Sequence, residues 1–283
     1  MSSSSLSHGR VAVVTGASSG IGKATATRLA SAGFVTYATA RRPAALASLQ
    51  AAGCRALPLD VTDEGSMVAA VRAVEAEHGA VSVLVNNAGY GVNGPLEELD
   101  LEDVRREFET NVFGLLRLSQ LVLPGMRAQG YGRIVNVGSM GGLFTAPGAG
   151  AYHASKYAVE ALSDALRVEV RPFGVDVVLI EPTGVRTAFA DKISATLGQT
   201  GSDGPYAAFK RNLDAGTRRL FADNARGILV PEDVAKVIVA AVQARRPRAR
   251  YRVGLVAHVL PRVRRLVGDR GWDALMARAV PVV

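Results

Sequence analysis

Residues 11–22 read Val-Ala-Val-Val-Thr-Gly-Ala-Ser-Ser-Gly-Ile-Gly, a short β-branched run that leads into a glycine-rich turn. An alanine-rich segment with helical spacing follows this turn. Glycines there let the backbone approach a phosphate, and the free N–H groups at the start of a helix attract its negative charge. The strand–turn–helix order therefore predicts a pyrophosphate-binding turn. Its candidate binding residues are Gly16, Ser18, Ser19, Gly20, Ile21 and Gly22.

Apolar runs alternate with alanine- and leucine-rich segments from residue 11 to residue 180. The apolar runs predict strands at 11–15, 34–37, 55–59, 81–85, 132–137 and 175–180. The segments between them predict helices at 20–32, 43–52, 63–78, 101–128 and 152–172. Nearly all-apolar strands that alternate with helices are typical of a parallel sheet with helices on both faces. The sequence thus predicts an α/β fold.

The pattern loosens after Pro182. Residues 183–229 mix glycine, polar residues and short helical pieces, and an irregular segment of this length is commonly functional, so we expect a substrate loop or lid. Beyond it we expect a helix at 231–244, a strand at 250–254, and helices at 255–267 and 271–280. The expected organisation is a disordered tail at 1–8 and a single domain at 9–283 that ends in a basic extension at 245–283.

Composition excludes several classes of protein. The 283 residues are 48% hydrophobic and 20% charged, which is too polar for a membrane bundle and too apolar for disorder. The single cysteine rules out an internal disulfide, and the four scattered histidines have no metal-ligand spacing, so we expect no metal. The first eight residues lack the features of a secretory signal. We therefore expect a cytoplasmic protein.

A second set of residues indicates proton-transfer chemistry. Tyr152 and Lys156 are four residues apart at the start of a predicted helix, so the phenol and the ammonium project from one face. A nearby cation favours the phenolate and brings tyrosine closer to proton transfer at neutral pH. Ser139 lies thirteen residues before Tyr152, at the end of a predicted strand, and Asn111 lies within the long predicted helix.

These motifs together resemble the classical short-chain dehydrogenase/reductase family. The resemblance rests on Thr15-Gly-x-x-x-Gly-x-Gly22, Asn86-Asn-Ala-Gly89, Ser139 and Tyr152-x-x-x-Lys156. Stretches such as Asn111-Val-Phe-Gly114 are similar to the subgroup of 17β-hydroxysteroid and retinol dehydrogenases. The resemblance implies a single-domain, Rossmann-type, doubly wound parallel sheet with a C-terminal helical lid. It also implies a nicotinamide-dependent interconversion of a carbonyl and an alcohol.

The resemblance implies a role for each catalytic residue. Tyr152 would exchange a proton with the substrate oxygen, and Lys156 would lower the pKa of Tyr152 and hold the nicotinamide ribose. Ser139 would bind the carbonyl oxygen, and Asn111 would support a water-mediated proton relay to Lys156. Further residues are implied to contact the cofactor: Asp60 and Val61 at the adenine, Asn87, Ala88 and Gly89 at the next strand end, and Pro182, Val185 and Thr187 near the carboxamide.

The end of the second predicted strand indicates which nicotinamide cofactor is bound. A site for NAD usually carries an acidic residue there, whereas an arginine accommodates the 2′-phosphate of NADP. This sequence has Arg41 and Arg42 and no acid between residues 37 and 43. A planar guanidinium suits a phosphate in both geometry and charge, so we expect NADP(H).

The substrate is expected to be a small lipophilic ketone, aldehyde or alcohol. Its expected wall is apolar and includes Leu143, Phe144, Phe189, Ile193, Leu197 and Phe221. A nicotinamide-binding regulator or scaffold with little catalysis is the alternative.

The net charge of +8 is concentrated in an arginine-rich stretch, residues 245–270, which could contact a membrane surface. A solvated basic face is the other interpretation of that stretch. Pro261 is expected to interrupt any long amphipathic helix there. Nucleic acid is not expected, because no recognition motif is present. We expect a homodimer or homotetramer, by resemblance, through the helices around 101–128 and 152–172.

Overall fold

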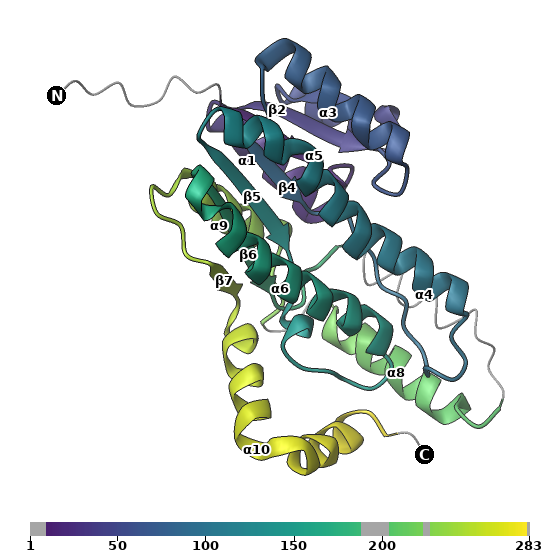
Figure 1. The fold of residues 1–283 in the computed structure, drawn as a ribbon. Helices are drawn as coiled ribbons and strands as arrows, with labels where there is room; N and C mark the ends of the chain where they lie inside the picture. The colour runs from purple at the N-terminus through teal and green to yellow at the C-terminus, as the bar shows by residue number, and fades with distance from the viewer. Residues whose placement is uncertain (1–9, 188–203, 223–226, 282–283) are drawn as a thin grey trace.

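Seven parallel strands form one sheet in the order β3-β2-β1-β4-β5-β6-β7 (Figure 1). The structure is a computed structural model and describes residues 10–187, 204–222 and 227–281. The strands are β1 Val11–Val14, β2 Val35–Ala40, β3 Arg55–Pro58, β4 Val83–Asn86, β5 Gly132–Val137, β6 Val175–Pro182 and β7 Arg250–Val253. The strand order reverses beside β1, as in a doubly wound sheet, and this confirms the predicted fold class.

Helices cover both faces of the sheet. The α-helices are α1 Gly20–Ser31, α2 Ala47–Ala51, α3 Glu64–His78, α4 Leu101–Phe108, α5 Gly114–Ala128, α6 Gly150–Val170, α8 Ala207–Leu220, α9 Pro231–Gln243 and α10 Leu255–Ala279. Short 3-10 turns occupy Pro43–Leu46, Met140–Gly142 and Arg171–Phe173. One hydrophobic core joins α1 and α9 to the sheet, and a second core joins α3 and α5 to its other face.

Two boundaries differ from the sequence prediction in ways that affect the site. Strand β2 continues to Ala40, so Arg41 follows its carboxyl end directly. The predicted helix at 101–128 is interrupted by a π-helical turn, Glu109–Phe113, which contains Asn111. Single π turns inside α-helices frequently occur at functional sites.

The C-terminal region corrects one sequence inference. We expected Pro261 to interrupt a long amphipathic helix, but α10 continues through this buried proline. The helix breaks instead at Gly268, whose φ of 65° lies outside the helical region and suits glycine. Two helical halves result, close to those predicted at 255–267 and 271–280.

Other predictions fall partly on parts of the chain that the structure does not describe. The tail at 1–8 lies outside the described residues, as do Phe189, Ile193 and Leu197 of the expected substrate wall. Of the predicted lid, residues 183–187, 204–222 and 227–229 are described. Among the described residues, no helix has the length and apolar character needed to cross a membrane.

Candidate active site

The glycine-rich turn between β1 and α1 packs directly on the end of β4. The Oγ1 atom of Thr15 accepts hydrogen bonds from the backbone N–H groups of Asn87 and Ala88, both at 2.9 Å. In return, Nδ2 of Asn87 donates to the Thr15 carbonyl at 2.9 Å. A Cβ added at Gly22 would lie 2.5 Å from Nδ2 of Asn87, so this close approach requires glycine. The two strand ends at the point of sheet reversal are therefore held together.

The start of α1 fits the phosphates of a dinucleotide. Ser19 occupies the N-cap position of α1, but its side chain forms no capping hydrogen bond. No acidic residue occupies the first turn of the helix. The Ala17 N–H donates to the Thr39 carbonyl at 2.9 Å, which draws the turn against the end of β2. Exposed Ser18 and Arg41 thus lie on neighbouring strand ends. Free N–H groups, hydroxyls and a guanidinium suit a phosphorylated ribose and a pyrophosphate.

The other expected cofactor residues lie at the same edge of the sheet. Oδ1 of Asp60 accepts hydrogen bonds from the N–H and the hydroxyl of Thr62, which fixes the turn after β3. Beyond β6, Val185 bridges to Leu229. A Cβ added at Gly20 would lie 2.9 Å from Cγ2 of Thr187, so the segment after β6 reaches the start of α1.

Ser139, Tyr152 and Lys156 meet beyond the carboxyl end of β5. The Ser139 side chain is hydrogen-bonded to Tyr152, and its Oγ accepts the Gly141 N–H at 3.0 Å. The Lys156 ammonium lies 5.7 Å from the centroid of the Tyr152 ring and donates to the Val137 carbonyl at 2.9 Å. The fold therefore brings together a hydroxyl from the turn after β5 with a phenol and an ammonium from one face of α6.

The pKa of Tyr152 differs from the sequence expectation. We expected Lys156 to lower it, but burial raises the pKa of Tyr152 to about 12, and the nearby Glu107 raises it further. The hydrogen bond with Ser139 acts in the opposite direction. Burial also lowers the pKa of Lys156 to about 8. At neutral pH, Tyr152 is therefore a protonated phenol, which is the form that donates a proton.

Glu107 is a buried member of the site that the sequence did not single out. Its Oε2 accepts the Val92 N–H at 2.8 Å, and its Oε1 accepts the Ser155 hydroxyl at 3.2 Å. Burial raises the pKa of Glu107 to about 7, against the effects of these hydrogen bonds and of Lys156. Helix α4 and the turn after it carry several acids, so nothing in the sequence marks this one as buried.

The Asn111 side chain is engaged by protein groups. Its Nδ2 donates to the Tyr90 carbonyl at 2.8 Å and to Ser155 at 3.0 Å, and its Oδ1 accepts the Tyr90 N–H at 3.1 Å. Asn111 and Glu107 together fix the backbone that follows Gly89. Ser155, to which the sequence gave no role, connects them.

His153, which also had no predicted role, connects α6 to the loop after Ser139. Its Nδ1 accepts the Ala146 N–H at 3.2 Å, and its ring meets that of Phe144. Trp272 on α10 packs on Phe144 and donates from Nε1 to the Thr145 carbonyl at 2.8 Å. Phe144 is therefore buried under α10, whereas Leu143 and Phe221 keep partial exposure.

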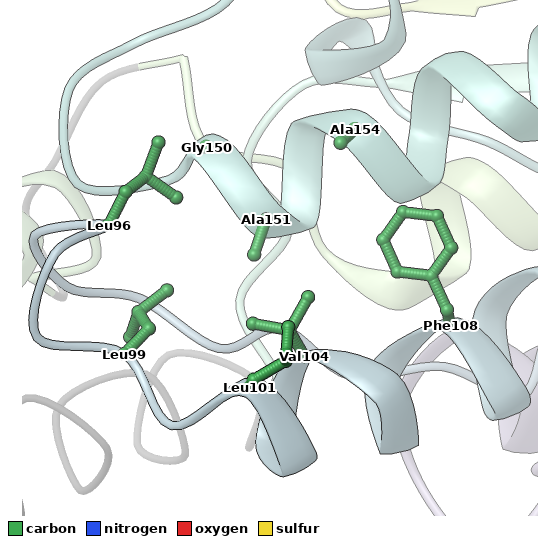
Figure 2. A pocket seen from close by; sticks show the side chains of 8 residues that line it. All are labelled: Leu96, Leu99, Leu101, Val104, Phe108, Gly150, Ala151 and Ala154. Carbon is green, nitrogen blue, oxygen red and sulfur yellow. The ribbon is translucent and has the colours of Figure 1, made fainter.

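An apolar hollow of about 370 Å³ lies between α4 and the start of α6 (Figure 2). It is lined by Leu96, Leu99, Leu101, Val104, Phe108, Gly150, Ala151 and Ala154. Figure 2 shows the side chains of the α4 region facing the first turns of α6. None of the expected catalytic or cofactor residues lines this hollow.

Comparison with known proteins shows the family. A family model described as short chain dehydrogenase matches residues 10–198, and the chain belongs to this family of oxidoreductases. It is 37% identical to 3-ketodihydrosphingosine reductase of Bacteroides thetaiotaomicron, over 89% of this chain and 90% of that protein. It is 39% identical to 17-beta-hydroxysteroid dehydrogenase type 1 of Homo sapiens, over 85% of this chain and 76% of that protein. A solved short-chain dehydrogenase/reductase of Burkholderia phymatum in complex with NAD is 31% identical, with a TM-score of 0.79. The match covers 91% of this chain and 93% of that chain.

The raised pKa of Glu107 predicts a pH dependence of stability. Between pH 4.5 and 7 the folded state holds a proton that the unfolded state has released, so the free energy of unfolding falls as the pH rises. Between pH 5 and pH 7, the free energy of unfolding of Glu107→Gln should fall by about 2 kcal/mol less than that of the unsubstituted protein. Urea unfolding followed by circular dichroism measures this difference. Exposed Glu109→Gln is the control, and an equal loss in Glu107→Gln and the unsubstituted protein would refute the assignment.

Proposed function

We propose that this protein is an NADP(H)-dependent oxidoreductase that reduces a lipophilic ketone or aldehyde to an alcohol. The observation that carries the proposal is the contact of Ser139 with Tyr152, with Lys156 one turn along the same helix. Membership of the family and the phosphate-compatible turn before α1 support it. The intact Tyr152 and Lys156 favour an enzyme over a regulator or scaffold.

The proposed reaction uses each group in one role. Ser139 donates a hydrogen bond to the carbonyl oxygen and stabilises the negative charge that develops there. Tyr152, which is protonated at neutral pH, donates the proton from its hydroxyl to that oxygen. Lys156 positions the phenol and the ribose of the cofactor, and Asn111 supports the relay that returns a proton. When bound, the nicotinamide supplies or accepts a hydride at C4.

The choice of NADP(H) rests on the end of β2. Arg41 and Arg42 are exposed directly after Ala40, and the nearby Ser18 and Ser19 are exposed as well. A bidentate guanidinium–phosphate contact recognises the 2′-phosphate that NAD lacks. A relative with this fold is in complex with NAD. A preference for NADP(H) over NAD(H) therefore has to come from these residues rather than from the fold.

The lipophilic substrate class rests on the described walls and on the relatives. Gly184 lies after β6, where an added Cβ would meet Phe221 and Ile228, so this side is apolar. Leu143, four residues after Ser139, is half-buried. The names of two relatives refer to a ketodihydrosphingosine and a hydroxysteroid. An apolar cleft suits such ketones better than a sugar or an acid.

We also propose a homodimer or homotetramer that is formed through α4, α5 and α6. Leu96 and Leu101 line the apolar hollow of Figure 2 and are exposed, and Phe113 in the turn between α4 and α5 is exposed as well. Burial of such a surface in a second copy would remove apolar area from water.

The cofactor assignment predicts the effect of a charge reversal. Arg41→Asp should weaken NADPH binding about 10- to 100-fold and leave NADH binding no weaker, because only the 2′-phosphate loses its partner. Fluorescence titration with both cofactors at matched salt measures this effect. Arg28→Asp, at the exposed C-terminal end of α1, is the matched control. Unchanged NADPH preference in Arg41→Asp would exclude the assignment.

The proton-donor assignment predicts that Tyr152→Phe lowers kcat for ketone reduction about 10²- to 10⁴-fold. NADPH binding should change little, because the phenyl ring keeps the packing. NADPH oxidation with 3-ketodihydrosphingosine, a 17-ketosteroid and a small keto acid provides the measurement. Tyr157→Phe alters an exposed tyrosine on the same helix and should retain activity. Retained activity in Tyr152→Phe would contradict the mechanism.

A further inference from the structure

The first half of α10, Leu255 to Val267, presents an apolar stripe to solvent. Leu255, Val259 and Leu266 are 78%, 45% and 84% exposed. Their spacing of four and seven residues places them on one face of the helix. The buried residues of this half, Ala257 and Pro261, lie on the opposite face. Single exposed leucines are ordinary, but an aligned stripe on the outward face of one helix is the pattern of an interaction surface.

Positive charge surrounds this stripe. From residue 245 to residue 267 the chain carries eight arginines and no acidic residue. His258, Arg262 and Arg265 follow one another at four and three residues, so they form one flank of the stripe. Arg262 and Arg265 are exposed, and within the described residues neither forms an ion pair. A helix with an apolar face and arginines at its edge is typical of a helix that lies in a membrane interface.

A basic hollow lies at the start of the same helix. It has a volume of about 270 Å³ and is lined by Arg248, Arg250, Tyr251, Arg252 and His258. Arg250 is paired with Glu160, Asp164 and Glu181, and Arg252 is paired with Glu181. Exposed Arg248 forms no ion pair within the described residues. The hollow therefore offers a guanidinium, a phenol and an imidazole beside Leu255. This chemistry suits a lipid phosphate next to acyl chains.

We propose that residues 245–267 form a docking face for an anionic lipid bilayer, with the stripe Leu255–Val259–Leu266 entering the interface and the arginines meeting the headgroups. Figure 1 shows α10 at the margin of the molecule, beyond β7 and outside the layers that cover the sheet. The helix can therefore meet a flat surface without rearrangement of the cores. Apolar burial and attraction to anionic lipid both contribute to such binding.

The second half of α10 connects this face to the catalytic group. Trp272 is anchored to Phe144 and to the Thr145 carbonyl, a few residues after Ser139. At the end of the helix, Val280 packs against Phe209 and Leu213 of α8. Docking of the first half would hold the substrate side of the enzyme at the bilayer, where lipophilic ketones partition. This consequence rests on the proposed function, whereas the docking face itself does not.

Vesicle co-sedimentation of the full chain, without cofactor or substrate, tests the docking face. Vesicles of phosphatidylcholine with about one third phosphatidylglycerol should pellet the protein at low salt, and pure phosphatidylcholine should pellet at least tenfold less. High salt should weaken the binding, since it screens the arginines. No binding to the anionic vesicles at low salt would overturn the proposal and leave the proposed reaction untouched.

Two variants test the residues. The double variant Leu255→Ser with Leu266→Ser should weaken vesicle binding at least tenfold, and Arg262→Gln with Arg265→Gln should weaken it and reduce its salt dependence. Val168→Ser with Leu220→Ser removes exposed apolar side chains elsewhere and should bind as the unsubstituted protein does. Circular dichroism checks that each variant folds.

Two results for the leucine variant would overturn the assignment. If it binds anionic vesicles as tightly as the unsubstituted protein, another surface carries the binding. If vesicles are not bound and the leucine variant has a smaller mass by light scattering, the face belongs to a contact between two copies of the chain.

Discussion

The hydroxyl of Thr15 accepts two backbone N–H groups from the end of β4, and the site depends on this contact. It joins the two strand ends between which the sheet order reverses. The turn before α1 is thereby fixed against Asn87, and the start of α1 is left open toward the edge where all the carboxyl ends meet. In an open parallel sheet this edge is where ligands bind. The glycine at position 22 is required by the same contact, because a side chain would collide with Asn87.

Burial sets the chemistry of the catalytic group. Lys156 and Glu107 are buried and Tyr152 is half-buried, and the loss of water around these groups favours the neutral form of each. A protonated phenol beside Ser139 suits donation to a carbonyl oxygen. Glu107 also anchors the backbone at Val92, and Asn111 anchors Tyr90. Ser155 joins Glu107 and Asn111 to the backbone carbonyl of Tyr152, so these residues form one hydrogen-bonded unit.

The fold and most of the site follow from the sequence, because they rest on local patterns. Local patterns can be recognised without knowledge of the tertiary structure. They include the apolar strands, the glycine-rich turn and the pair Tyr152 and Lys156, which are four residues apart. The burial of Glu107 cannot be predicted in this way, because α4 has the composition of an acidic surface helix. Only tertiary packing buries this carboxyl group. The raised pKa of Tyr152 cannot be predicted from the sequence for the same reason: a neighbouring cation is visible in the sequence, whereas desolvation is not. The anchor from Trp272 to Thr145 joins residues 127 positions apart, which no local pattern reports.

Packing decides where the C-terminal helix α10 breaks. Pro261 stays within α10 on its buried side, and Gly268 supplies the left-handed residue at which the helix turns. The bend allows one half to face outward with its leucines and arginines and the other half to return to the loop after Ser139. A single element thereby joins the surface of the molecule to the catalytic group.

In the proposed reaction, the reduced nicotinamide held at this edge of the sheet would supply a hydride to a ketone while Tyr152 supplies the proton. The most direct test uses NADPH that carries two deuterium atoms at C4, a lipophilic ketone and mass spectrometry of the alcohol product. The account predicts one deuterium on the carbinol carbon, in an amount that depends on Tyr152. An alcohol without deuterium, or equal transfer by Tyr152→Phe, would contradict it.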